Sequence, residues 1–164
     1  ETAGFGGGCH WCTEAVFRSL AGVTDVRQGF ISADAPHDSY SEAVSVTWDA
    51  GRISFEDLIL AHLLTHASTS NHKMRGKYRS AVYVHEAESG IKAAQIIDRL
   101  GQDSDSAFVT QVLPFRMFKP SDARFQDYYE NNRGGPFCDT YIEPKLALLR
   151  QRFSKLQSGA LNHV

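Results

Sequence analysis

Residues 4–16 read Gly-Phe-Gly-Gly-Gly-Cys-His-Trp-Cys-Thr-Glu-Ala-Val, so a glycine-rich run ends on Cys9 and a helix-like pattern follows it. Because the apolar side chains recur at every fourth position and Gly22 comes just past them, we predict a helix over His10–Ala21. Cys9 then lies at the N-terminus of this helix. There the unpaired N–H groups and the helix dipole stabilise a thiolate, and the pKa of a cysteine can fall to roughly 3.5–7.5. We therefore predict that Cys9 is a reactive thiol rather than a small buried hydrophobe.

The chain has 164 residues, 42% of them hydrophobic, which predicts one globular domain over residues 1–164. A formal charge of −2 provides no basic surface for nucleic acid, and no apolar run is long enough to cross a bilayer. Three cysteines are too few for a disulfide scaffold and are typical of a cytoplasmic protein. We therefore expect a cytoplasmic monomer that binds neither nucleic acid nor membrane.

Hydrophobic periodicity and turn residues place further elements along the chain. Strands are predicted over Ala3–Phe5, Val23–Phe30, Glu42–Asp49, Arg79–His85 and Phe108–Leu113. Helices are predicted over Phe55–His66, capped by Ser54; over Ala87–Leu100, stopped by Gly101; and from Pro144 onward, with Leu146, Leu149, Phe153 and Leu156 facing inward. This order is typical of an α+β fold, a ferredoxin-like split βαβ two-layer sandwich with a mostly antiparallel sheet, followed by a long C-terminal coil and a helix.

The connecting segments are expected to be irregular. Ile31–Ser39 is rich in turn formers and is predicted to be an exposed loop. Ser121 is a candidate cap for a short helix that reaches Asn132. The glycines and proline of residues 133–138 predict a loop that carries Cys138.

Cys9-His10-Trp11-Cys12 is a C-x-x-C motif, which has three interpretations: dithiol redox chemistry, half of a metal site, or two unrelated thiols. A structural zinc site needs a second paired cluster, and the remaining candidates are only Cys138 and scattered histidines. We therefore expect no metal. A thiol–disulfide or thiol-metal binding protein that uses Cys9 and Cys12 stays as the alternative function.

Several motifs together resemble the A-type peptide methionine sulfoxide reductases, in the same order along nearly the whole chain. They are Gly-Gly-Gly-Cys9-His-Trp-Cys-Thr-Glu-Ala-Val-Phe, Gln-Gly-Phe30, Ser-Glu42-Ala-Val, Lys-Tyr78-Arg-Ser-Ala-Val-Tyr, Pro-Phe-Cys138 and Pro-Lys-Leu. The resemblance implies the split βαβ sandwich and the reduction of methionine S-sulfoxide, free or in proteins, to methionine. It also implies that no cofactor is needed and that reduced thioredoxin or another thiol is the electron donor.

The resemblance also implies roles for individual residues. Cys9 attacks the sulfoxide sulfur and becomes a sulfenic acid. Glu42 is the proton donor and Tyr78 a hydroxyl donor, which agrees with the chemistry because the sulfoxide oxygen leaves poorly until it is protonated. Trp11 forms an aromatic wall for the methyl group of the substrate.

Three features depart from the family pattern and indicate a divergent branch with its own substrate pocket. His10 stands where a phenylalanine is usual, Phe30 stands where the first tyrosine is usual, and the segment 71–76 replaces a loop that contains an aspartate. His10 and Phe30 are therefore counted, with Trp11, as substrate-binding residues.

Two thiols are candidates for resolving the sulfenic acid on Cys9 into a disulfide. Cys12 is one helical turn away, but it lies on the apolar stripe of its helix, where burial raises a thiol pKa. Cys138 aligns with the resolving cysteine of the family and lies on the predicted loop. We therefore expect a Cys9–Cys138 disulfide, with Cys12 as the alternative resolving thiol.

Overall fold

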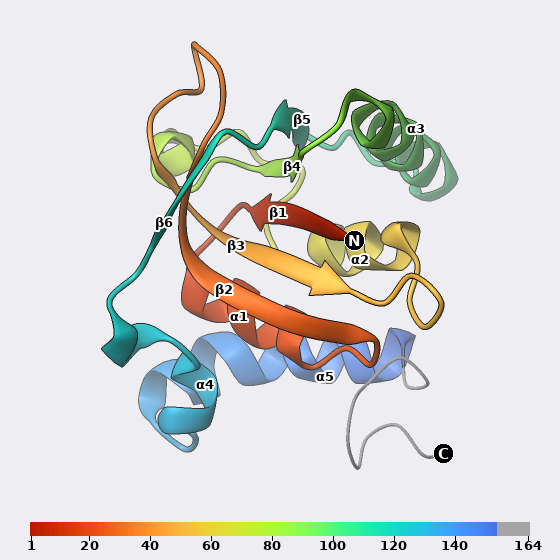
Figure 1. Ribbon diagram of the computed structural model, residues 1–164. Coiled ribbons are helices and arrows are strands. Elements are labelled where there is room, and N and C mark those ends of the chain that lie inside the picture. Colours follow the sequence, from red (N-terminus) through yellow and green to blue (C-terminus); the bar gives the residue numbers. More distant parts are fainter. Residues whose placement is uncertain (154–164) are drawn as a thin grey trace.

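The computed structural model describes residues 1–153, in which a six-stranded sheet is combined with helices (Figure 1). The sheet contains β1 (Thr2–Gly6), β2 (Val23–Ser32), β3 (Ser41–Trp48), β4 (Ala81–Val84), β5 (Gln111–Pro114) and β6 (Met117–Pro120). The α-helices of the described residues are α1 (His10–Arg18), α2 (Phe55–Leu64), α3 (Ala87–Ser104), α4 (Tyr128–Asn131) and α5 (Glu143–Arg152). Shorter helical turns are η1 (Lys73–Gly76), η2 (Ala123–Phe125) and η3 (Cys138–Ile142), the last a π-helix. The fold is therefore of the mixed α+β class, as predicted.

The strands lie in the order β5-β4-β1-β3-β2-β6, and only the β4–β5 pair is parallel within this sheet. Helix α1 connects β1 to β2, and β3 lies between these two strands, antiparallel to both. The register pairs Gly6 of β1 with Ala43 of β3, and Glu42 with Phe30 of β2. Since β1 leads directly into the glycine run, this register places Glu42 next to the chain that enters α1.

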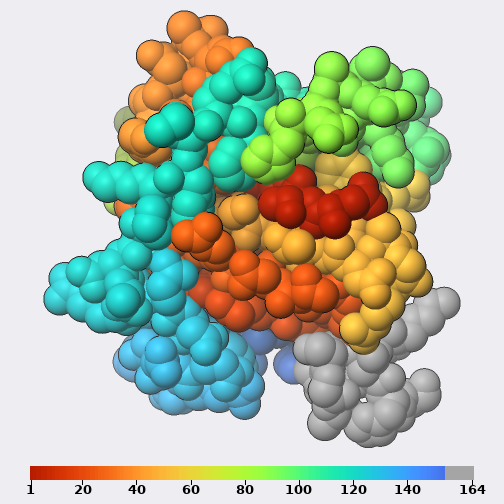
Figure 2. Space-filling view, in the orientation of Figure 1, coloured from red at the N-terminus to blue at the C-terminus, as the bar shows by residue number. Residues whose placement is uncertain are grey.

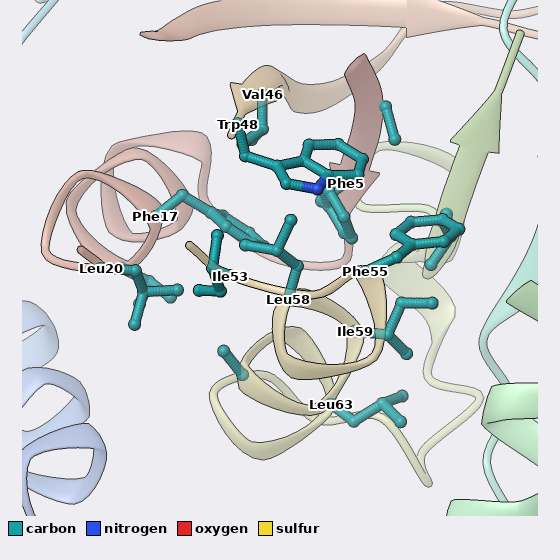
Figure 3. Close-up of a cluster of buried hydrophobic side chains, with 14 of the residues drawn as sticks. Phe5, Phe17, Leu20, Val46, Trp48, Ile53, Phe55, Leu58, Ile59 and Leu63 are labelled. Atoms are coloured by element: carbon teal, nitrogen blue, oxygen red, sulfur yellow. The ribbon is translucent and has the colours of Figure 1, made fainter. Parts of the chain in front are cut away.

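The main core lies between the sheet and helices α1 and α2, where the side chains labelled in Figure 3 pack together. Phe5 from β1, Phe17 from α1 and both Leu58 and Ile59 from α2 are completely or almost completely buried there. Full burial of such a side chain contributes roughly 1.5–3 kcal/mol. This apolar layer fixes α1, and with it Cys9, against the end of β1.

The predicted helices are confirmed, with corrections to their ends. The N–H of Asp57 donates to the Ser54 hydroxyl at 3.0 Å, which confirms the predicted cap of α2. Helix α1 ends at Arg18 instead of Ala21, because the chain turns at Ser19 and reaches Gly22 with a φ of +99°. Helix α3 does not stop at Gly101 but continues to Ser104, where Asp105 closes it in the left-handed conformation.

The edge strand β6 was not predicted, and the loop predicted at Ile31–Ser39 begins later. Strand β2 continues through Ser32, and Ile31 is fully buried, because β6 pairs with this end of β2. Arg116 beside β6 also forms an ion pair with Asp34. In Figure 2 the segment around residue 116 (teal) accordingly lies beside the projecting loop of residues 33–40 (orange).

The region before α5 differs most from its prediction. Ser121 does not cap a helix: its hydroxyl donates to Gln28 Oε1 at 2.7 Å, and Asp122 caps the short turn η2 instead. Helix α5 begins at Glu143, one residue before Pro144, and its inward residues Leu146, Leu149 and Phe153 are buried as predicted. Leu156 lies outside the described residues.

Candidate active site

Cys9 lies where the glycine run after β1 meets α1, and it is the N-cap residue of that helix. Its carbonyl accepts hydrogen bonds from the N–H groups of Cys12 and Thr13, at 3.1 and 3.2 Å. A Cβ atom at position 7 would collide with the ring of His66, so Gly7 permits a close approach of this chain to the segment that follows α2. The predicted position of Cys9 at a helix start is therefore confirmed.

The surroundings of Cys9 favour its thiolate. The Cys12 thiol and the Trp11 N–H donate hydrogen bonds to the Cys9 sulfur and hold its pKa below the usual value of a cysteine, although burial and the charge of Glu42 oppose this shift. The pKa of Cys12 is strongly raised, because its proton bonds to the Cys9 sulfur and because it is buried. Of this pair, Cys9 is thus the thiol that ionises more readily, and Cys12 is the protonated donor.

Glu42 lies beside the first turn of α1 and is 8% exposed. Its Oε1 accepts a hydrogen bond from the backbone N–H of His10 at 3.2 Å and lies 3.6 Å from His10 Nε2. Its Oε2 lies 3.7 Å from Lys77 Nζ. The carboxyl group is therefore bound to His10, the residue that follows Cys9, and the exposed side chain of Lys77 lies on its other side.

His10 and Phe30 lie together with Glu42. His10 Nδ1 is 2.7 Å from the carbonyl of Gly29, so this nitrogen carries the proton, and the ring packs edge-on against Phe30 at 5.2 Å between centroids. His10 is thus buried between Glu42 and β2. The structure brings together these three predicted site residues.

A cavity of about 380 Å³ opens beside Cys9. Its lining includes Cys9, Cys12 and Tyr78, together with His66, His72 and Lys145. Tyr78 is held there because its neighbours bind β3: Lys77 accepts from the Glu42 N–H at 3.0 Å, and Arg79 donates its N–H to the Ser41 hydroxyl at 2.8 Å. Cys9 and Tyr78 therefore share one cavity, whereas Glu42, His10, Phe30 and Trp11 do not line it.

Trp11 belongs to an aromatic cluster beside the cavity. Its ring stacks on Tyr128 at 4.1 Å with an interplanar angle of 6°, and Phe125 and Phe137 also pack against it. Its Nε1 is buried and has no hydrogen-bond partner within the described part of the chain. Phe137 connects the cluster to the cavity, since it lines the cavity and contacts Trp11.

The prediction that Cys138 lies on a loop is wrong. Cys138 begins the π-helix η3, is 0% exposed, and packs in an apolar cluster with Cys12, Ala15 and the half-buried Cys9. Burial and the nearby carboxylates of Asp139 and Glu143 raise the pKa of its thiol. The helix forms because residues 136–142 pack their apolar side against α1, which the glycines and proline of the sequence did not reveal. The three thiols lie in one cluster nevertheless.

Glu14 has a structural role that the sequence did not predict. It is 1% exposed, and its carboxylate accepts from the N–H groups of Asp127 and Tyr128 and from Gln28 Nε2, at 2.8, 3.2 and 2.9 Å. This arrangement fixes the start of α4 and so holds the Tyr128 ring on Trp11. In the sequence, the only indication of this role was a carboxylate among the apolar residues of the predicted helix.

The described residues also bear on two other features, a metal site and a membrane-spanning helix. Within residues 1–153, no group of three or more His, Cys, Asp and Glu side chains is arranged to hold a metal ion. No helix in that range is both long enough and apolar enough to cross a membrane.

Comparison with known proteins gives a consistent result. Residues 1–157 match the family model described as peptide methionine sulfoxide reductase. The chain is 36% identical over 169 residues to the peptide methionine sulfoxide reductase MsrA of Deinococcus radiodurans, a match that covers 93% of this chain and 82% of the relative. Two solved structures share the fold. One is methionine sulfoxide reductase A of Corynebacterium diphtheriae, with a TM-score of 0.68, 22% identity, and coverage of 80% of this chain and 74% of that one. The other is Mxr1 from Saccharomyces cerevisiae in complex with Trx2, with a TM-score of 0.59, 19% identity, and coverage of 78% and 84%.

Proposed function

The chain belongs to the peptide methionine sulfoxide reductase family, and from that premise we propose that Cys9 is the nucleophile of its thiol-dependent reduction of methionine sulfoxide. The position of Cys9 at the start of α1 and at the cavity wall, where hydrogen bonds lower its pKa, is the observation that carries this assignment. The thiolate attacks the sulfoxide sulfur. The oxygen passes to Cys9 as a sulfenic acid, and methionine leaves. The S epimer is the proposed substrate, free or in proteins.

Glu42 supplies the proton that the sulfoxide oxygen needs, and Tyr78 supplies a hydroxyl group. The hydrogen bond from the His10 N–H to Glu42 supports the first role, because it holds the carboxyl group next to Cys9. The cavity shared by Tyr78 and Cys9 supports the second. Trp11, His10 and Phe30 are the proposed binding residues for the methyl group: they lie next to the cavity without lining it, His10 packs against Phe30, and Phe137 joins Trp11 to the cavity wall.

A second thiol then attacks the sulfenic acid, which gives a disulfide and water. Cys138 is the proposed resolving thiol, and Cys12 is the alternative. The segment of Cys138 follows Gly134, which has a φ of +80°, and consists of a π-helix, a form that often marks functional sites. Cys138 also packs in the same cluster as Cys9.

Thioredoxin is the proposed reductant of this disulfide, and no prosthetic group takes part. The yeast relative Mxr1, whose structure was determined with Trx2, supports this partner. A cytoplasmic monomer is the proposed form of the enzyme. The β1–α1–β2 unit with β3 between its strands supports the split βαβ description of the fold.

A single-turnover experiment tests this function. Fully reduced protein is mixed with an excess of a methionine sulfoxide peptide without any recycling reductant, and both methionine and free thiols are counted. One methionine for every two thiols lost is expected. Thiol loss without methionine would contradict the proposal and indicate a thiol–disulfide or thiol-metal binding protein.

A further inference from the structure

The cavity beside Cys9 is lined by basic groups. Lys145 from α5 contributes an ammonium group, and His66 and His72 contribute imidazole rings. Among the described residues that line this cavity, there is no aspartate and no glutamate. A ligand in the cavity therefore meets cationic and neutral groups, plus the thiolate of Cys9.

Arg75 adds a second positive charge behind the cavity wall. One of its nitrogens donates to the carbonyl of Gly7 at 2.8 Å and to that of Tyr78 at 2.9 Å. These partners are neutral, so the guanidinium charge is not cancelled by them. Arg75 thus connects two residues of the cavity lining, Gly7 and Tyr78, and its positive charge lies close to both.

Lys145 has a similar environment. Its Nζ donates to the carbonyl of Thr65, which uses one of its three protons. No carboxylate forms an ion pair with Lys145 in residues 1–153. The ammonium group therefore keeps N–H donors and a positive charge that can bind a ligand.

His66 is the neutral member of the basic groups in the lining. Its pKa is lowered to about 4, first by burial and also by the charges of Arg75 and Lys145. Glu42, a carboxylate that acts on Cys9, lies outside the cavity lining and already faces His10 and Lys77. Once Cys9 is oxidised to the sulfenic acid, the negative charge of its thiolate is also lost from the cavity.

On the basis of the proposed function, we propose that this cavity selects methionine sulfoxide that has a carboxylate side chain beside it, as in a peptide with aspartate or glutamate neighbours. Lys145 is the specificity-determining residue. It lines the same cavity as Cys9, and its ammonium group is formally charged at neutral pH. The long stem of Lys145 lets its ammonium group reach a carboxylate near the opening while the sulfoxide lies at the thiolate.

Two blocked peptides of equal shape test this proposal, acetyl-Asp-Met(O)-Asp-amide and acetyl-Asn-Met(O)-Asn-amide. The measured quantity is the ratio of their kcat/KM values at neutral pH and low salt. We expect the aspartate peptide to be preferred by roughly ten- to a hundredfold, the effect of one charge-assisted hydrogen bond. The preference should decrease as salt is added.

The Lys145→Met variant keeps the apolar stem and removes the charge, so its ratio should fall to about one. The ratio compares two substrates on the same protein, so a partly destabilised variant still gives a valid answer. Lys92→Met is the matched control: Lys92 is exposed on α3, away from the cavity lining, and its loss should change neither the ratio nor the activity.

A wild-type ratio near one, or an unchanged preference in Lys145→Met, would overturn the proposal. Failure of the proposed function would look different, because neither peptide would then give methionine at all.

Discussion

The backbone N–H of His10 lies 3.2 Å from Oε1 of Glu42, which joins the first residue of α1 to the beginning of β3. The strand register produces this contact: Gly6 pairs with Ala43, so Glu42 lies beside the point where β1 ends and the glycine run begins. Cys9 and the carboxyl group of Glu42 are thus brought close together by sheet pairing across more than thirty residues of sequence.

The Cys9→Ser variant should have no sulfoxide reductase activity and an intact fold. A serine hydroxyl stays protonated at neutral pH, so the same hydrogen bonds yield no nucleophile. Methionine formation measures activity, and circular dichroism with thermal unfolding checks the fold. Turnover by a folded Cys9→Ser protein would rule out Cys9 as the nucleophile.

The Glu42→Gln variant should lose activity by about 10²–10⁴-fold, the usual contribution of a general acid. Its Cys9 should still react with iodoacetamide, and at lower pH than in the wild type, because the charge of Glu42 raises the pKa of Cys9. Rate measurements and alkylation across a pH series test both statements. A rate that does not change would assign the proton to another group, such as Tyr78.

The oxidised enzyme should contain a Cys9–Cys138 disulfide after one turnover. Cys12 is disfavoured as the attacking thiol because it is fixed inside α1, whereas the Cys138 segment has a π-helix and follows two glycines that let it move. Mass spectrometry of peptides cut under non-reducing conditions identifies the linkage. A Cys9–Cys12 linkage, or normal recycling by thioredoxin in Cys138→Ser, would refute this assignment.

The Glu14→Ala variant should lose on the order of 3 kcal/mol of unfolding free energy, because the N–H groups of Asp127 and Tyr128 and the amide of Gln28 lose a buried acceptor. Urea denaturation measures this loss. Glu130→Ala is the matched control, since Glu130 forms an exposed ion pair with Arg133 and its removal should have no measurable effect. Equal stability of the two variants would contradict the structural role of Glu14.

Stability should fall as the pH decreases below about 6.5. The pKa of His62 lies well below 6.5 because of burial, and that of His66 is about 4, so both rings are neutral in the folded protein. The unfolded chain takes up these protons below pH 6.5. The stabilisation is therefore complete above that pH and is lost toward pH 4, by about 1.4 kcal/mol per pH unit for each histidine.

Urea denaturation at several pH values measures this slope. His66→Asn should flatten it between pH 6.5 and 4, whereas His85→Asn, at an exposed position, should leave it unchanged. The same slope in His66→Asn and wild type would show that His66 does not carry the effect.

The sequence determined the features that depend on residues close together in the chain. A cysteine between a glycine run and an amphipathic segment sufficed to predict Cys9 at a helix start, and Ser54 with Asp57 sufficed to predict the cap of α2. Such features form through hydrogen bonds within one turn of helix, so their signal is local. The motifs around Glu42, Tyr78 and Cys138 were enough to identify the family.

Only the tertiary structure decided the features that depend on distant partners. The edge strand β6 exists because it pairs with β2, Glu14 is buried because the start of α4 donates to it, and Cys138 is buried because its helix packs against α1. The cavity beside Cys9 likewise combines the residues that follow α2, the chain before Tyr78, and α5. No hydrophobic periodicity and no turn residue in the sequence marks these contacts. Each of them depends on the free energy of packing between segments that only the complete fold brings together.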